Sequence, residues 1–123
     1  MRKLKWGALM IGAIVVAAGR AEAGDRYGAI AYSPSTGAYG WSYDHVSRAA
    51  AEGAALAQCN QRAGDCQVPL WFQNACGALA IGDGGGWGTG WGTSRGLAEG
   101  YALQTCRQYT GNCSVRRWAC TAR

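Results

Sequence analysis

Side chains that can act as an acid, a base or a nucleophile are scarce in this sequence. It contains a single histidine, His45, and Asp44 is the carboxylate next to it. Catalysis by proton transfer or nucleophilic attack needs such groups at fixed positions. Ser42 or Ser47 would complete a triad with this pair, but neighbouring residues often point apart, and neither serine lies in a G-x-S-x-G nucleophile elbow. We therefore interpret His45 as a solvated loop residue that leads into a helix.

Two glutamates occupy matching positions in the segments S-R-A-A-A-E and S-R-G-L-A-E. They are Glu52 and Glu99, each four residues after an arginine, Arg48 or Arg95. A pair of carboxylates that flank a sugar bond is the machinery of a glycosidase. Near the start of a helix, however, the helix dipole or an i, i+4 pair with the arginine already explains them. We interpret both glutamates as structural.

Aromatic side chains form the most distinctive candidate binding site. Large rings alternate with small residues in two segments, which contain Tyr39, Trp41, Tyr43, Trp87 and Trp91. Alternation with a period of two places the rings of one strand on one face. Such rings form a platform that stacks on a sugar ring or an apolar patch of a partner. The alternative is that they cover the sheet beneath the helices. Trp71 and Trp118 occupy matching positions near cysteines in two similar segments, so we expect them in the core.

An internal repeat organises these residues. Shifting the chain by 47 positions aligns residues 47–71 with 94–118 without a gap, and 13 of the 25 positions are identical. Composition alone would give roughly two or three identities, so we interpret the match as a duplicated unit. The two copies span residues 27–76 and 77–120 within one domain, residues 24–123.

Each copy is predicted to run strand, turn, strand, helix, strand. The first strands are expected at residues 29–32 and 78–81, the helices after Ser47 and Ser94 as N-caps, and the third strands at 67–72 and 114–118. The glycine-rich residues 82–92 lack the G-K-[ST] ending of a phosphate loop and are interpreted as a hairpin with close backbone approach. The predicted fold is α+β: a duplicated β-β-α-β unit with one sheet and two helices packed on it.

Six cysteines predict a disulfide framework. If both copies fold alike, Cys59 pairs with Cys66 and Cys106 with Cys113, which leaves Cys76 with Cys120 as a bridge between the copies. Zinc is the rival interpretation, but the spacing does not match a C-x-x-C knuckle and only one histidine is available. We predict no metal and no cofactor.

The first 23 residues have the order of a secretory signal peptide. Basic residues come first, followed by 14 uncharged and mostly apolar residues and then the small-residue site Ala21-Glu22-Ala23. Crossing a bilayer takes about 20 apolar residues, so we expect cleavage after Ala23, no stable membrane anchor, and a secreted protein, periplasmic or extracellular. Residues 24–123 contain eight basic and six acidic residues, and this weak, scattered charge argues against nucleic-acid binding.

Several motifs together resemble the bacterial domain of unknown function 4189 family. They include G-A-I-A-Y-S-P-S-T-G-A-Y-G-W, N-A-C-G-A-L-A and the closing W-A-C, across essentially all of residues 24–123. The resemblance implies a small secreted domain with paired cysteines, and it brings no catalytic residues. We expect a non-enzymatic binding or inhibitory module for a protein or a cell-wall glycan. The alternative is a small secreted hydrolase that uses His45 with a carboxylate, and a third possibility is a structural component of the envelope.

Overall fold

The structure, a computed structural model, describes residues 24–122. The predicted signal peptide, residues 1–23, lies outside the described residues. The two halves of the described chain share one order of elements, β-β-α-β, as the sequence predicts. The first half consists of β1 (Tyr27–Tyr32), β2 (Tyr39–His45), α2 (Arg48–Cys59) and β3 (Gln67–Gln73). The second consists of β4 (Cys76–Ile81), the short 3-10 helix η2 (Asp83–Gly85), β5 (Trp87–Gly92), α3 (Arg95–Arg107) and β6 (Ser114–Cys120).

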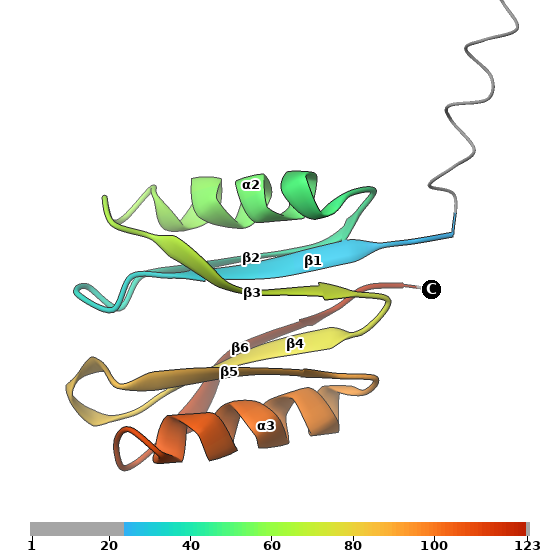
Figure 1. The fold of residues 1–123 in the computed structure, drawn as a ribbon. Helices are drawn as coiled ribbons and strands as arrows, with labels where there is room; N and C mark the ends of the chain where they lie inside the picture. Colours follow the sequence, from blue (N-terminus) through green and yellow to red (C-terminus); the bar gives the residue numbers. More distant parts are fainter. Residues whose placement is uncertain (1–23, 123) are drawn as a thin grey trace, which may run out of the picture.

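The strands form two sheets, so the prediction of a single sheet is wrong. Each is antiparallel and three-stranded, in the orders β2-β1-β3 and β5-β4-β6. The sheets are stacked, and α2 and α3 cover their two outer faces, which gives four layers (Figure 1). The reason is that the central strands β1 and β4 are buried on both faces. A single sheet with both helices on one face would leave the other face of these strands in water.

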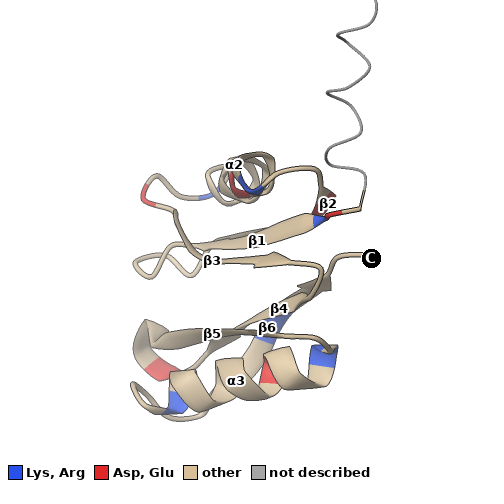
Figure 2. Cartoon of the chain, turned by 45° about the vertical axis from the view of Figure 1, so that its right-hand side comes forward, with Lys and Arg blue, Asp and Glu red and all other residues tan. Residues whose placement is uncertain are grey.

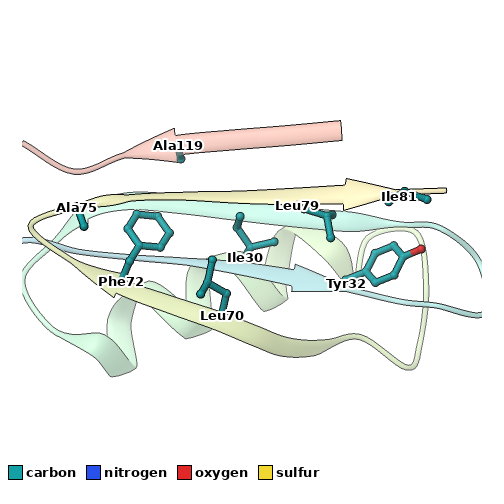
Figure 3. Close-up of a cluster of buried hydrophobic side chains, with 8 residues drawn as sticks. All are labelled: Ile30, Tyr32, Leu70, Phe72, Ala75, Leu79, Ile81 and Ala119. Atoms are coloured by element: carbon teal, nitrogen blue, oxygen red, sulfur yellow. The ribbon is translucent and has the colours of Figure 1, made fainter. Parts of the chain in front are cut away.

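The core between the sheets consists of the larger aliphatic and aromatic side chains. Ile30, Tyr32, Leu70 and Phe72 of the first sheet meet Leu79 and Ile81 of the second (Figure 3). These side chains occupy the faces of the strands that point away from the helices, in keeping with the alternation of a β-strand. This layer holds the two halves together and fixes which strands lie side by side: β2 packs against β6, and β3 packs against β5.

The layers between helix and sheet are made of small residues. Ala51, Ala55 and Cys59 of α2 are fully buried against Ala29 and Ala31. In the second half, a Cβ atom on Gly90 of β5 would lie 2.6 Å from a backbone oxygen of α3. The predicted close approach of the glycine-rich segment is therefore present, and it fixes β5 tightly against its helix.

Both helices begin where the sequence predicts. The hydroxyl oxygen of Ser47 accepts a hydrogen bond from the backbone N–H of Ala50 (3.1 Å). That of Ser94 accepts one from Leu97 (3.2 Å). These N-caps satisfy backbone donors that the first turn of a helix leaves without partners.

The three disulfides have the predicted pairings, but one of them has a different role. Cys59–Cys66 and Cys106–Cys113 each close the turn after a helix. Cys76 and Cys120 face each other on the paired strands β4 and β6. Because Cys76 is the first residue of β4, it belongs to the second half and not to the end of the first copy. This third disulfide therefore lies within the second sheet, and the expectation that it bridges the two copies is wrong. Among residues 24–122, no helix has the length and apolar character needed to span a membrane.

Candidate functional site

His45 and Asp44 lie at the end of β2, where Asp44 forms a bulge. His45 is the last residue of the strand and is paired with Tyr27 of β1, so its assignment to a loop is wrong. Asp44 has a φ of 60°, and its Oδ1 accepts a hydrogen bond from the backbone N–H of Ala122 (2.6 Å). The second half has no counterpart of this bulge between β4 and β5. The Asp44 carboxylate thus holds the end of the described chain against β2.

The hydroxyls of the two serines near His45 form hydrogen bonds with backbone groups and not with His45. The Ser42 hydroxyl donates to the carbonyl of Ala51 (2.7 Å) and accepts from the N–H of Ala29 (3.1 Å). Ser47 caps α2. Within residues 24–122 His45 has no hydrogen bond to a serine or a carboxylate, and no three His, Cys, Asp or Glu side chains cluster as metal ligands would. The geometry does not assemble a triad.

Glu52 and Glu99 pair with their arginines, as expected. Glu52 Oε2 lies 2.9 Å from Nε of Arg48, and Glu99 Oε2 lies 2.8 Å from Nε of Arg95. The two helices that carry these glutamates cover opposite outer faces of the molecule (Figure 1). Two carboxylates so placed cannot flank one glycosidic bond, because that arrangement requires them within about 10 Å of each other.

Trp71 and Trp118 are surface residues, so their assignment to the core is wrong. Each is 38% exposed. The guanidinium carbon of Arg48 lies 4.5 Å from the ring centre of Trp71, and that of Arg95 lies 4.0 Å from the ring centre of Trp118. Each half therefore presents the same stack of tryptophan, arginine and glutamate beside the first turn of its helix.

The five predicted binding aromatics do not form one platform. Tyr39, Trp41 and Tyr43 are on β2, whereas Trp87 and Trp91 are on β5. Since β2 packs against β6 and β5 packs against β3, the two groups lie along opposite sides of the sandwich. Tyr39, Trp41 and Trp87 are half-buried against the core between the sheets.

A groove of about 420 Å³ runs between β3 and β5, and we call it the apolar groove. Its most exposed ring is that of Trp91, which is 56% exposed, whereas the ring of Trp71 is stacked with Arg48. Its lining contains no charged side chain, and β3 and β5 are uncharged throughout (Figure 2). The residues that line it are Pro69, Leu70, Trp71, Phe72, Gln73 and Trp91.

Trp91 also lines a second hollow, of about 490 Å³, between β5 and α3, which we call the tyrosine shelf. It consists of Thr89, Gly90, Trp91, Gly92, Thr93, Leu97 and Tyr101. Tyr101 is 50% exposed, and Tyr109 follows two turns further along, in a neighbouring hollow that shares Thr89. Leu97, Tyr101 and Tyr109 were not predicted as binding residues. The sequence does contain a signal for them, because the matching positions of the first copy hold Ala50, Ala54 and Arg62. The second copy thus carries large apolar or aromatic side chains outside the buried stripe of its helix.

The opposite side of the sandwich carries a groove of about 460 Å³ between β2 and β6, which we call the arginine groove. It is lined by Trp41, Tyr43, Arg117, Trp118, Ala119 and Cys120. The guanidinium carbon of Arg117 lies 3.6 Å from the ring centre of Trp41. Trp41 and Tyr43 are among the predicted binding residues, whereas Arg117 is not.

A hollow at the turn end of the sheets is lined by Tyr32, Trp87 and Asp65, among others. Hydrogen bonds from the hydroxyls of Ser33 (2.5 Å) and Ser35 (2.6 Å) hold the pKa of the Asp65 carboxyl below its ordinary value. Burial raises the pKa of Tyr32. Because its carboxylate is already bonded by two hydroxyls, Asp65 ties the turn after β1 to the loop before β3 and is not a free base.

Comparison with known proteins identifies the family but no activity. Residues 27–120 match the family described as Domain of unknown function (DUF4189), so the chain belongs to that family. Over 63 residues the chain is 49% identical to Protein Rv1269c of Mycobacterium tuberculosis and to Protein Mb1300c of Mycobacterium bovis. This region is 51% of the chain and 48% of each relative, so the chain spans about half the length of these curated relatives. The NMR structure of Rv1813c from Mycobacterium tuberculosis is similar at a TM-score of 0.58 and 33% identity, covering 77% of this chain and 74% of that chain.

Proposed function

We propose that this member of the DUF4189 family is an exported, non-enzymatic binding module that holds a neutral stretch of cell-wall glycan. The ligand lies in the apolar groove and on the tyrosine shelf, and Trp91 contributes to both. The single observation that carries the proposal is the exposure of the Trp91 ring at two adjoining hollows whose lining residues carry no charge.

The chemistry of this surface suits a sugar. The C–H faces of a pyranose ring stack on an aromatic ring, and the hydroxyls at its edge need polar partners, which a purely apolar surface lacks. The groove and the shelf provide both kinds of group. The rings belong to Trp91 and Tyr101, and the polar partners are the Gln73 amide and the Thr89 and Thr93 hydroxyls. Trp and Tyr are suited to such half-wet sites because each combines a large apolar ring with a polar group.

The framework beneath the rings is rigid, which favours binding because little conformational freedom is lost when a ligand docks. A Cβ on Gly88 or Gly90 of β5 would lie within 3 Å of the backbone of α3, so strand and helix are in direct contact. The Cys106–Cys113 disulfide then fixes the end of α3 to the start of β6.

Export is part of the proposal. The predicted signal peptide supports it, and so do three disulfides in a small domain, because disulfides form and persist mainly in oxidising compartments outside the cytosol.

Calorimetric titration of the oxidised protein with a neutral oligomer, chitotetraose, tests the proposal. We expect saturable binding that Trp91→Ala weakens about tenfold, since the variant loses a stacked aromatic ring. Val46→Ala is the control, because Val46 is an exposed apolar residue outside the grooves and the shelf. The control variant should bind like the unmodified protein.

Two outcomes would overturn this function. One is the absence of saturable binding to the oligomer. The other is a Trp91→Ala variant that is folded by circular dichroism and binds with unchanged affinity. If Trp91→Ala instead abolishes capture of an envelope protein while no glycan binds, the ligand of this surface is a protein.

A further inference from the structure

The apolar groove and the arginine groove are equivalent places in the two halves of the chain. Leu70 of β3 pairs with Ile30 of β1, and Arg117 of β6 pairs with Leu79 of β4. Ile30 and Leu79 both point into the core between the sheets. Side chains of directly paired residues lie on the same face of a sheet, so Leu70 and Arg117 point into this layer from matching positions.

Their surroundings match as well. Trp71 beside Leu70 corresponds to Trp118 beside Arg117, and each tryptophan is stacked with the arginine of its own half. Trp41 and Thr89 are matched, because they pair with Ile30 and Leu79. The positions that hold Arg117 and Trp41 in the arginine groove, where the two side chains stack, are therefore held by Leu70 and Thr89 in the other pair of strands.

The cation of Arg117 is not balanced within the described part of the chain. Arg48 and Arg95 each have a glutamate partner, whereas no carboxylate lies within ion-pair distance of Arg117 among residues 24–122. Its Nε is buried and lacks a hydrogen-bond partner. Asp44 follows Tyr43 of this groove, but one of its carboxylate oxygens already accepts a hydrogen bond from the backbone N–H of Ala122.

Burying part of a guanidinium without a partner is unfavourable unless something else compensates. Stacking on Trp41 supplies part of the compensation. The stack also fixes the plane of the guanidinium, whose fork of N–H donors matches the two oxygens of a carboxylate. The groove therefore combines a fixed carboxylate receptor with rings that can stack on a sugar.

We propose that the arginine groove binds a carboxylate-bearing sugar, and that the chain thus has a neutral and an acidic glycan site on opposite sides of the sandwich. The inference deepens the proposed function and rests on it. The ligand is an acidic sugar that carries its carboxylate close enough to the sugar ring for Arg117 to reach while that ring stacks on the exposed Tyr43.

An NMR titration that follows the indole N–H signals of Trp41 and Trp91 tests this proposal. The acidic probe is the disaccharide of N-acetylglucosamine and N-acetylmuramic acid, and the neutral control is chitobiose. We expect the acidic probe to shift the Trp41 signal and chitobiose to leave it in place. Raising the ionic strength should weaken the acidic binding, because a charge pair at a solvent-accessible groove is screened by salt.

Arg117→Leu gives the arginine groove the residue that the apolar groove has. We expect it to weaken binding of the acidic disaccharide at least tenfold, since a charge-assisted hydrogen bond is lost, and to leave the Trp91 response to chitobiose unchanged. Arg62→Leu removes the same charge from an exposed loop, and it should bind the acidic probe normally. Arg117→Lys keeps the charge without the planar fork and should give an intermediate affinity.

The outcomes separate this inference from the proposed function. If chitobiose shifts Trp91 but the acidic probe does not shift Trp41, or if Arg117→Leu binds the acidic probe normally, the acidic site is wrong and the neutral site stands. If neither probe binds, both proposals fail. If Arg117→Leu is unfolded in its NMR spectrum, the Arg117→Lys variant decides, and full affinity in that variant would contradict recognition by the guanidinium fork.

Discussion

Phe72 on β3 lies against Gly77 on β4, across the boundary between the two sheets. A Cβ atom on Gly77 would be 2.5 Å from a carbon of the Phe72 ring. Gly28 on β1 lies against the same ring. One phenylalanine therefore packs on glycines of both central strands, and the spacing of the two sheets at this point is set by the thickness of its ring.

Gly77→Ala is expected to destabilise the protein by about 1–3 kcal/mol, because Phe72 and the strands around it have no room for a methyl group. Chemical denaturation measures this loss. Gly53→Ala is the control: Gly53 is an exposed helical residue with open space around its Cα, so this change should stabilise by about 0.5–1 kcal/mol through helix propensity. Equal effects of the two substitutions would contradict the close packing of Phe72.

Asp65 is expected to make the stability depend on acidic pH. Hydrogen bonds from Ser33 and Ser35 lower the pKa of this carboxyl in the folded state. Its contribution is therefore complete above the unfolded pKa of about 3.9 and is lost as the pH falls through the lower folded pKa. The unfolding temperature of the unmodified protein should be lower at pH 3 than at pH 7. In the Asp65→Asn variant this difference in unfolding temperature should be smaller. Ser35→Ala should narrow it less, and an NMR titration that places the Asp65 pKa at or above 3.9 would contradict the prediction.

The disulfides are expected to contribute unequally. In the chain-entropy model the seven-residue closure of Cys59–Cys66 is worth about 2.5 kcal/mol, and the 44-residue closure of Cys76–Cys120 about 4 kcal/mol. Replacing each pair by alanines and measuring denaturant unfolding checks this order. Cys106–Cys113 closes a loop of the same length as Cys59–Cys66. Removing either of these two disulfides should therefore lower the free energy of unfolding by the same amount. A larger loss from either short loop than from Cys76–Cys120 would reverse the predicted order.

The double variant Glu52→Gln and Glu99→Gln is expected to keep both stability and glycan binding. Each glutamate forms a partly exposed i, i+4 ion pair with an arginine, and such pairs contribute about 0.3–0.5 kcal/mol each. Thermal unfolding and titration with chitotetraose measure the two properties. Hydrolysis of a glycan by the unmodified protein that disappears in the double variant would show that the glutamates are catalytic.

The local elements follow from the sequence because their signals are local. Ser47 and Ser94 are N-caps with hydroxyls that reach the first turn, and the third strands begin at Gln67 and Ser114, where they are predicted. Pro69 lies on an edge strand, as its missing N–H requires. The disulfide pairing also follows, because the matched loops of two similar copies leave one pair of cysteines over.

The division into two sheets follows from the apolar residues on both faces of the central strands. In β1, Ala29 and Ala31 face the helix while Ile30 and Tyr32 face the other way, and all four are buried. A strand with two apolar faces must be covered on both of them. The chain has two such strands and only two helices, so each helix covers one face and the remaining two faces must cover each other.

The positions of the tryptophans depend on packing that the sequence does not specify. Trp71 is identical in both copies, and this identity suggested a core role. Its ring lies instead beside the first turn of α2, under Arg48, where a repeated surface stack produces the same identity. The grooves lie between strands from different halves, so no spacing within one copy points to them.

In the described chain every disulfide closes within one half, so Asn74 and Ala75 provide the covalent link between the sheets. Two chains that exchange halves about this link would rebuild both sheet–sheet cores from different molecules and keep all their cystines intact. Reducing agents would not resolve such a domain-swapped dimer. Its separation requires the layer that contains Phe72 and Leu79 to open, which makes the exchange a matter of folding conditions and protein concentration rather than of redox state.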